Sequence, residues 1–197
     1  MTWLSPVALN GPHASLEPLS RDHKDGLVEA VKDGELWKLW YTSIPSSEGM
    51  AAEIDRRLGL QAAGSMLPFT VKDADGKIAG MTTYMNVDAT NKRVEIGSTW
   101  YAKRVQRTPL NTQCKLLLLT HAFEKLNCIA VEFRTHFFNH QSRRGIERLG
   151  AKLDGILRSH QVAPNGTLRD TVVYSIIASE WPTVKAHLTY QLHEKAR

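Results

Sequence analysis

A single α/β (α+β) domain, with a mixed central sheet flanked by helices, is the fold that the sequence predicts. The first third reads mostly as helix, and the middle reads as an antiparallel meander of strands. A long apolar helix then leads into a further strand, and a strand–helix–strand unit of this kind makes a right-handed crossover between parallel strands. The 197 residues, 42% of them hydrophobic and 23% charged, fit one packed domain over residues 1–197.

The first third is expected to contain one short strand and two helices. Residues 14–19 form the strand, and Ser20 is a good N-cap for the helix after it. Pro45 breaks the aromatic segment that follows, and Ser46 or Ser47 can cap a second helix that ends near Gly64. The apolar faces of the two helices are Leu27, Ala30 and Val31, and Met50, Ile54 and Leu58.

Three antiparallel strands are expected next. Asp75-Gly76 joins two β-rich runs between residues 67 and 87, as a hairpin turn would. Residues 94–101 continue as a third strand with alternating faces. One predicted face carries Val94, Ile96, Ser98 and Trp100, and the other carries Glu95, Gly97, Thr99 and Tyr101.

The second half supplies the crossover and a final hairpin. Thr108 can cap a long helix with Pro109 at its first position. A strand over residues 129–135 follows, and then a short helix that Gly150 closes. Residues 152–178 read as a hairpin around a Pro-Asn-Gly-Thr turn, and residues 181–197 as a polar helix. The predicted sheet therefore changes from antiparallel to parallel at residues 103–111.

Composition narrows the classes of function. The formal net charge of +5 favours anionic partners such as nucleic acid or phosphorylated cofactors. The two cysteines indicate reduced thiols, and without a signal-type leader we expect a cytoplasmic protein. The longest Leu run, residues 116–119, is far too short for a membrane span of about 20 residues. His136 and His140 do not secure metal geometry, so no metal is expected.

The segment Lys-Arg-Val-Gln-Arg-Thr-Pro-Leu-Asn, residues 103–111, is the candidate anion site. A helix N-terminus offers unpaired backbone N–H groups, and Arg104 and Arg107 add charge. Pro109 removes one backbone donor, and no glycine lets the backbone approach a phosphate closely. On these residues alone, a phosphate cradle and a solvated basic loop remain equally good interpretations.

A second motif resembles a known family. Asn139, Ser142, Arg143-Arg144 and Leu149-Gly150, read after a strand, are similar to the GNAT superfamily of acyl-CoA-dependent N-acetyltransferases, especially its RimJ/RimL-like branch. The Glu-Ile-Gly of residues 95–97 also resembles that family, and the likeness covers roughly residues 67–179. The family's Gln/Arg-x-x-Gly-x-Gly/Ala loop corresponds to residues 104–109, where Arg107 and Pro109 replace both glycines.

The resemblance implies acetyl-CoA as acyl donor. Its pantetheine arm would pair with residues 94–101 where two parallel strands splay apart, and Ser142 would protonate the departing thiolate. A helix-capping role for Ser142 is an equally good interpretation. The implied cofactor contacts are Tyr101, Arg104, Val105, Gln106, Arg107, Thr108, Leu110, Asn111, Thr112, Asn139, Ser142 and Arg143.

The expected reaction is direct transfer of acetyl to a primary amine in a ternary complex. An amine must lose a proton before it attacks a thioester, and a carboxylate can accept that proton. Glu95 is the candidate base and Glu132 the reserve, although either could be a carboxylate paired with arginine. The acceptor is a protein or peptide N-terminus or a small amine. Its pocket could be lined by Trp37, Trp40 and Tyr41, together with Tyr84 or Met85, although aromatic residues at helical spacing are more often part of the core.

Two alternatives remain at this point. The chain could be a basic RNA- or ribosome-associated module, although it lacks an RNP-type aromatic strand or a Gly-x-x-Gly clamp. It could also bind CoA with little transferase activity, because the loop glycines are absent. The family resemblance leaves room for a homodimer.

Overall fold

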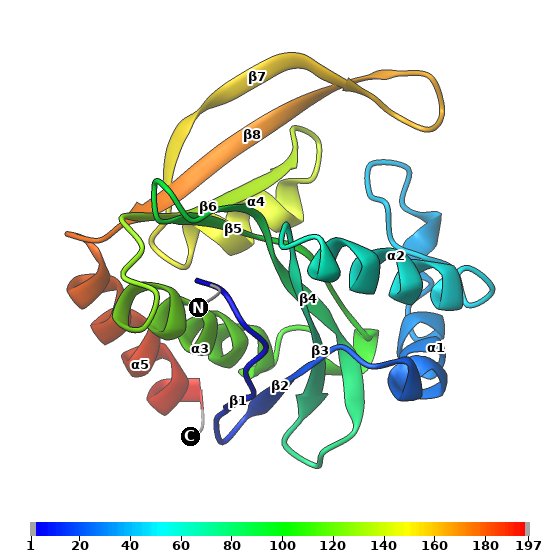
Figure 1. Cartoon of the computed structure of the whole chain (residues 1–197), viewed down its shortest axis with the longest axis horizontal. Helices are drawn as coiled ribbons and strands as arrows, with labels where there is room; N and C mark the ends of the chain where they lie inside the picture. Colours follow the sequence, from blue (N-terminus) through cyan, green and yellow to red (C-terminus); the bar gives the residue numbers. More distant parts are fainter. Residues whose placement is uncertain (1–2, 196–197) are drawn as a thin grey trace.

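One eight-stranded sheet forms the centre of the computed structural model, which describes residues 3–195 (Figure 1). Along the sheet the order is β1-β2-β3-β4-β5-β6-β8-β7. The strands are β1 (Leu9–Asn10), β2 (Ala14–Pro18), β3 (Leu67–Asp73), β4 (Ile78–Asp88), β5 (Arg93–Tyr101), β6 (Ala130–His136), β7 (Lys152–Val162) and β8 (Leu168–Ile177). The helices are α1 (Lys24–Lys32), α2 (Met50–Ala62), α3 (Leu110–Glu124), α4 (His140–Glu147) and α5 (Trp181–Lys195).

Helices cover both faces of the sheet. Helices α1 and α2 lie on one side, and α3 and α5 lie on the other (Figure 1). The side chains of β4 alternate between them: Thr83 accepts a hydrogen bond from Arg57 in α2, whereas the Tyr84 hydroxyl donates to the Leu118 carbonyl in α3. We call these two sides of the sheet the α2 face and the α3 face.

All strand pairs are antiparallel except β5 with β6. The parallel pairing is short, with Arg93 opposite Ala130, Val94 opposite Val131 and Glu95 opposite Glu132. Both strands continue beyond this point without pairing to each other. The mixed sheet, the meander and the splayed parallel pair are therefore confirmed, while the two-residue β1 was missed.

The predicted faces of β5 are wrong beyond Gly97. Ser98 has a φ of 48°, and the register moves from Thr83↔Gly97 to Met81↔Trp100. One residue of β4 thus faces two residues of β5, which is a β-bulge, and the bulge reverses the alternation of side chains. Trp100 lies on the α2 face, and Tyr101 lies on the α3 face.

Two helix starts differ from the prediction by a few residues. Helix α2 begins at Met50 after Gly49, and Ser46 accepts only the Gly49 N–H. Helix α3 begins at Leu110 after Pro109, while the Thr108 hydroxyl accepts the Leu110 N–H at 3.3 Å, as a capping side chain does.

Helix α3 is the centre of the hydrophobic core. Its inward side chains are buried against the sheet, and α5 packs on its other side, where Trp181 stacks on Phe123. The thiols of Cys114 and Cys128 are buried and unbridged. In the described part of the chain, the helices all fall short of the length and apolarity that a bilayer span requires.

Candidate functional site

The site begins where β5 and β6 separate. Beyond the Glu95↔Glu132 pair, the facing edges of the two strands lack partners, as far as residues 3–195 show. Helix α3 starts just past the end of β5, so its N-terminus lies at the open end of this fork. The fork therefore combines free backbone groups for an extended ligand with a helix N-terminus for an anion.

The loop into α3 has a glycine-like backbone without the glycine. Arg107 has a φ of 62°, the left-handed region that glycine enters without penalty. The backbone N–H groups of Asn111 and Thr112, in the first turn of α3, have no acceptor among the described residues. Arg107 is exposed at this turn. Two backbone donors and one guanidinium are thus available to a phosphate.

Arg104 points elsewhere. Its guanidinium forms an ion pair with Asp73 and donates to the Ile78 carbonyl at 3.0 Å, both at the β3–β4 hairpin. Its backbone N–H donates to Asp33 at 2.8 Å. The side chain is thereby fixed on the hairpin, which leaves Arg107 as the better placed of the two predicted arginines.

Other predicted loop residues hold the loop together. Gln106 donates through Nε2 to the Tyr101 carbonyl at 3.0 Å, and the Thr108 hydroxyl donates to the Val105 carbonyl at 2.7 Å. Val105 is buried in the core. The Tyr101 side chain also faces inward, and its hydroxyl lies beside the Cys114 thiol on the α3 face. Burial there raises the pKa of the Tyr101 hydroxyl.

Helix α4 supplies the second predicted motif. The Asn139 side chain accepts the Ser142 N–H at 3.0 Å, so Asn139 rather than Ser142 caps this helix. Arg143 donates to the Tyr174 hydroxyl at 3.2 Å and to the Phe137 carbonyl at 3.3 Å. The Ser142 hydroxyl has no hydrogen-bond partner among the described residues, so the capping role considered for it is wrong.

Glu95 lies at the point of the fork, on the α2 face. It is 5% exposed and accepts a hydrogen bond from Asn86 Nδ2 at 2.7 Å, with Arg134 Nε at 3.6 Å. Burial raises the pKa of this carboxyl above its usual range, although Asn86 and Arg134 act in the opposite direction. A carboxylate with a raised pKa is a more effective proton acceptor near neutral pH.

Glu132 has a different environment. It forms ion pairs with Arg93 at 2.5 Å and with Arg134 at 2.9 Å. Partial burial raises its pKa, but the hydrogen bonds from Arg93 and Arg134 outweigh burial and lower it. Glu132 is thus the paired strand carboxylate that the sequence allowed for, and Glu95 is the better candidate base.

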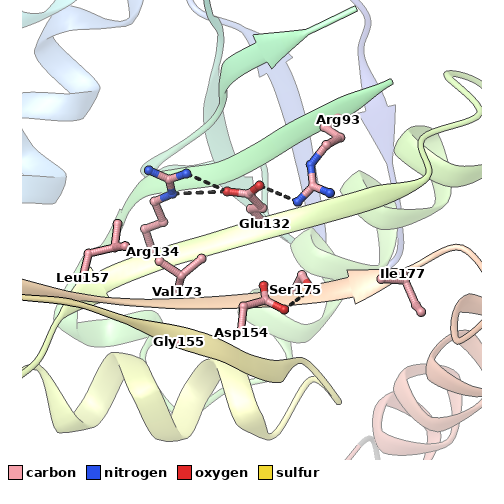
Figure 2. Close-up of a pocket in the computed structure, with 9 residues that line it drawn as sticks. All are labelled: Arg93, Glu132, Arg134, Asp154, Gly155, Leu157, Val173, Ser175 and Ile177. Carbon is pink, nitrogen blue, oxygen red and sulfur yellow. Dashed lines mark hydrogen bonds and ion pairs between the residues drawn. The ribbon is translucent and has the colours of Figure 1, made fainter. Parts of the chain in front are cut away.

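Two adjoining hollows open beside these carboxylates on the α2 face. The larger, of about 400 Å³, is lined by residues of β6, β8 and β7 and by Arg93 of β5 (Figure 2). The smaller, of about 170 Å³, includes Glu95 and Asn86. Both are bordered by Arg93, Glu132 and Arg134, so the hollow beside Glu95 adjoins the larger one.

Aromatic side chains border the open end of β6. Trp40 packs edge-on against His136 at 5.1 Å between ring centroids, and Tyr41 and Phe138 join the same cluster. Trp40 and Phe138 are more than half exposed. Of the other predicted lining residues, Met85 lies next to Gly97, but Tyr84 is fully buried on the α3 face and cannot line this pocket.

Two buried cations contact the bulge of β5, and neither was predicted from the sequence. Arg57 of α2 donates to Thr83 at 2.6 Å and to the Ser98 carbonyl at 3.5 Å. Lys115 of α3 donates to the Thr99 hydroxyl at 3.1 Å from the other face. In the sequence, Arg57 lies beside Leu58 of a predicted apolar face, and Lys115 lies among apolar residues of α3. Helical spacing therefore did not indicate a role for either cation.

Comparison with known proteins decides the family. The model of the acetyltransferase (GNAT) domain family matches residues 14–152. The chain belongs to this family. A GCN5-related N-acetyltransferase from Brucella melitensis superposes with a TM-score of 0.85 at 30% identity, over 96% of this chain and 86% of that one.

Two further proteins resemble this GNAT protein, one in sequence and one in fold. YdaF of Bacillus subtilis (strain 168), provisionally named a ribosomal N-acetyltransferase, is 35% identical over 107 residues, which are 54% of this chain and 57% of YdaF. RimJ of Mycobacterium smegmatis, solved with CoA-disulfide, has the same fold, with a TM-score of 0.77 at 21% identity over 94% of this chain and 93% of RimJ.

Proposed function

We propose that the protein transfers an acetyl group from acetyl-CoA to the N-terminal amine of a peptide or protein, by direct attack in a ternary complex. The observation that carries this proposal is the fork between β5 and β6, with buried Glu95 at its point and the N-terminus of α3 at its open end. Its donor and acceptor sides open on opposite faces of the sheet.

The donor side is the α3 face. The pyrophosphate would lie against the free N–H groups of Asn111 and Thr112, with Arg107 beside it. The residues present fit such a group, because the left-handed turn at Arg107 exposes the backbone as a glycine would. The arm of the donor would then extend along the unpaired edge of β5, as an added strand does.

The acceptor side is the α2 face. Glu95 would accept the proton of the attacking amine, directly or through a water molecule. The bulge at Ser98 leaves the ladder locally disrupted, so a backbone N–H there can donate to the oxyanion. Ser142, whose hydroxyl has no partner among the residues described, would deliver a proton to the thiolate.

An extended acceptor fits this face better than a small amine. The hollow beside Glu95 continues into the larger one over β6, β8 and β7, and the cluster of Trp40, Tyr41 and Phe138 stands at the other end of the fork. The name of YdaF points to a ribosomal protein as acceptor for that relative. We extend that acceptor class to this chain.

Calorimetric titration with CoA at moderate salt tests the donor side of the proposal. The parent is expected to bind, and Arg107→Ala is expected to bind about tenfold more weakly, since a phosphate loses one charge-assisted hydrogen bond. Arg144→Ala, which removes an exposed arginine of α4, measures the general effect of lost charge. A parent chain that ignores CoA and binds RNA in a salt-dependent manner would contradict the proposal.

A further inference from the structure

Lys115 is a buried cation without an anion. Its side chain lies on the α3 face of the fork and is 6% exposed. Its single hydrogen-bond partner within residues 3–195 is the Thr99 hydroxyl, although an ammonium group has three donors. In the same part of the chain it takes part in no ion pair.

The neighbouring titratable groups do not supply the missing charge. They are the Cys114 thiol on α3 and, next to that thiol, the Tyr101 hydroxyl on β5. Burial raises the pKa of Cys114 to about 12 and also raises that of Tyr101, so both are neutral at neutral pH. Burial lowers the pKa of Lys115 to about 8, at which most of it is still charged at neutral pH.

Arg57 is a second buried cation at the bulge, and it differs from Lys115 because it has an anionic partner. It is 2% exposed and reaches the same bulge from the α2 face, but Glu53 pairs with it at 2.7 Å. An unpaired buried charge is costly, so its retention calls for a partner outside the described chain. Lys115 therefore marks a place where a ligand brings negative charge.

The position of Lys115 identifies that charge. Glu95, the candidate base, is on the α2 face of β5, so the amine attacks from there. Lys115 and Ser142 are on the opposite side, because α3 and α4 both pack on the α3 face, where Arg148, directly after α4, donates to the Thr112 hydroxyl of α3 at 3.5 Å. The thiolate leaves the thioester on the side opposite to the attacking amine. It therefore moves toward the α3 face.

We propose that the Lys115 ammonium stabilises the thiolate that leaves the acetyl donor. In this step the amine nitrogen bonds to the carbonyl carbon, the carbon–sulfur bond breaks, and its electron pair stays on sulfur. The amine proton passes to Glu95, while Lys115 offsets the sulfur charge until the thiolate takes up a proton. This inference rests on the proposed function, and it names the residue that stabilises the leaving group of that reaction.

The ionisation of the CoA thiol bound to the intact protein provides the test. Thiolate formation is followed by its ultraviolet absorbance as pH is raised, with the parent and Lys115→Met. In the parent, the thiol pKa is expected to fall below that of free CoA, and in Lys115→Met to rise by about one unit or more. Lys125→Met, at the exposed end of α3, is the matched control and should titrate like the parent.

Two further measurements separate stabilisation of the thiolate from simple binding. Desulfo-CoA should bind equally to the parent and to Lys115→Met, while kcat falls about tenfold or more in the variant without a matching rise in KM. Lys115→Arg, which keeps the charge, should recover part of the loss.

Three results would overturn the inference. One is a CoA thiol that has the same pKa when bound to the parent as when free. This result does not depend on whether any variant folds. Another is an equal loss of affinity for CoA and desulfo-CoA, which would reduce Lys115 to a contact for the arm. The third, no CoA binding by the parent, would remove the proposed function as well, whereas the first two leave that function intact.

Discussion

At the scale of single residues, the proposed chemistry depends on Glu95. A general base acts when ionised, and burial raises the pKa of Glu95, so activity should increase with pH through a pKa above its ordinary value of 4.5. Glu95→Gln should lower kcat by about 100-fold or more and remove that limb of the pH–rate profile, with CoA affinity unchanged. Glu132→Gln serves as comparison, and a larger loss there would assign the base to Glu132 instead.

The backbone conformation of Arg107 destabilises the folded chain, and we expect its guanidinium to be retained for ligand binding. A non-glycine residue in the left-handed region costs about 1 kcal/mol. Arg107→Gly and Arg107→Ala both remove the guanidinium, but only the glycine relieves the backbone. We expect the glycine variant to be about 1 kcal/mol more stable than the alanine variant in urea unfolding, with equally weakened CoA binding. Equal stability would show that the turn is not strained.

Lys115 predicts an unusual dependence of stability on pH. Its folded pKa, about 8, lies below the ordinary value of 10.5, so the unfolded chain holds more protons between these values. Stability is therefore reduced below pH 8, by up to about 3 kcal/mol, and recovers as pH rises from 8 to 10.5. Denaturant unfolding of Lys115→Met should lose this rise and give higher stability at pH 7. An unchanged slope would mean that Lys115 is solvated.

At the scale of elements, the bulge of β5 positions the site. A methyl group at Gly97 would lie 2.6 Å from Met85 Sδ and 2.8 Å from Glu95 Oε1, so Gly97→Ala must displace the carboxylate. We expect a stability loss of about 1–3 kcal/mol and a larger proportional loss of activity. Gly59→Ala, where nothing lies within 4 Å, is the control and should be stabilising by about 0.5–1 kcal/mol. Full activity in Gly97→Ala would show that Glu95 does not need this position.

The elements themselves were largely predictable, because period and turn residues are local signals. Asp75-Gly76 and the Pro-Asn-Gly-Thr turn gave two hairpins, and Pro109 gave the start of α3 within a residue. The bulge was not predictable, since a positive φ at Ser98 leaves no mark in the residue types. The bulge reverses the faces of Trp100 and Tyr101. The contacts of Arg57 and Lys115 depend on the bulge, so they could not be predicted either.

At the scale of the whole molecule, the proposed mechanism places the two substrates on opposite faces of the sheet. In that proposal the donor approaches from the side of α3 and α4, and the acceptor approaches from the α2 face. The family could be recognised from the Asn139–Gly150 motif, but the partners of individual side chains could not. Arg104 looked like a phosphate ligand, and it is bound to Asp73 across a hairpin 31 residues away in sequence.

Single-turnover transfer from acetyl-CoA to synthetic peptides, read by mass spectrometry, tests the central claim most directly. We predict one acetyl group on the peptide α-amine with the parent, a rate about 100-fold lower with Glu95→Gln, and none on a peptide with a blocked N-terminus. Tight binding of acetyl-CoA without transfer to any free peptide N-terminus, or equal transfer by Glu95→Gln, would contradict it.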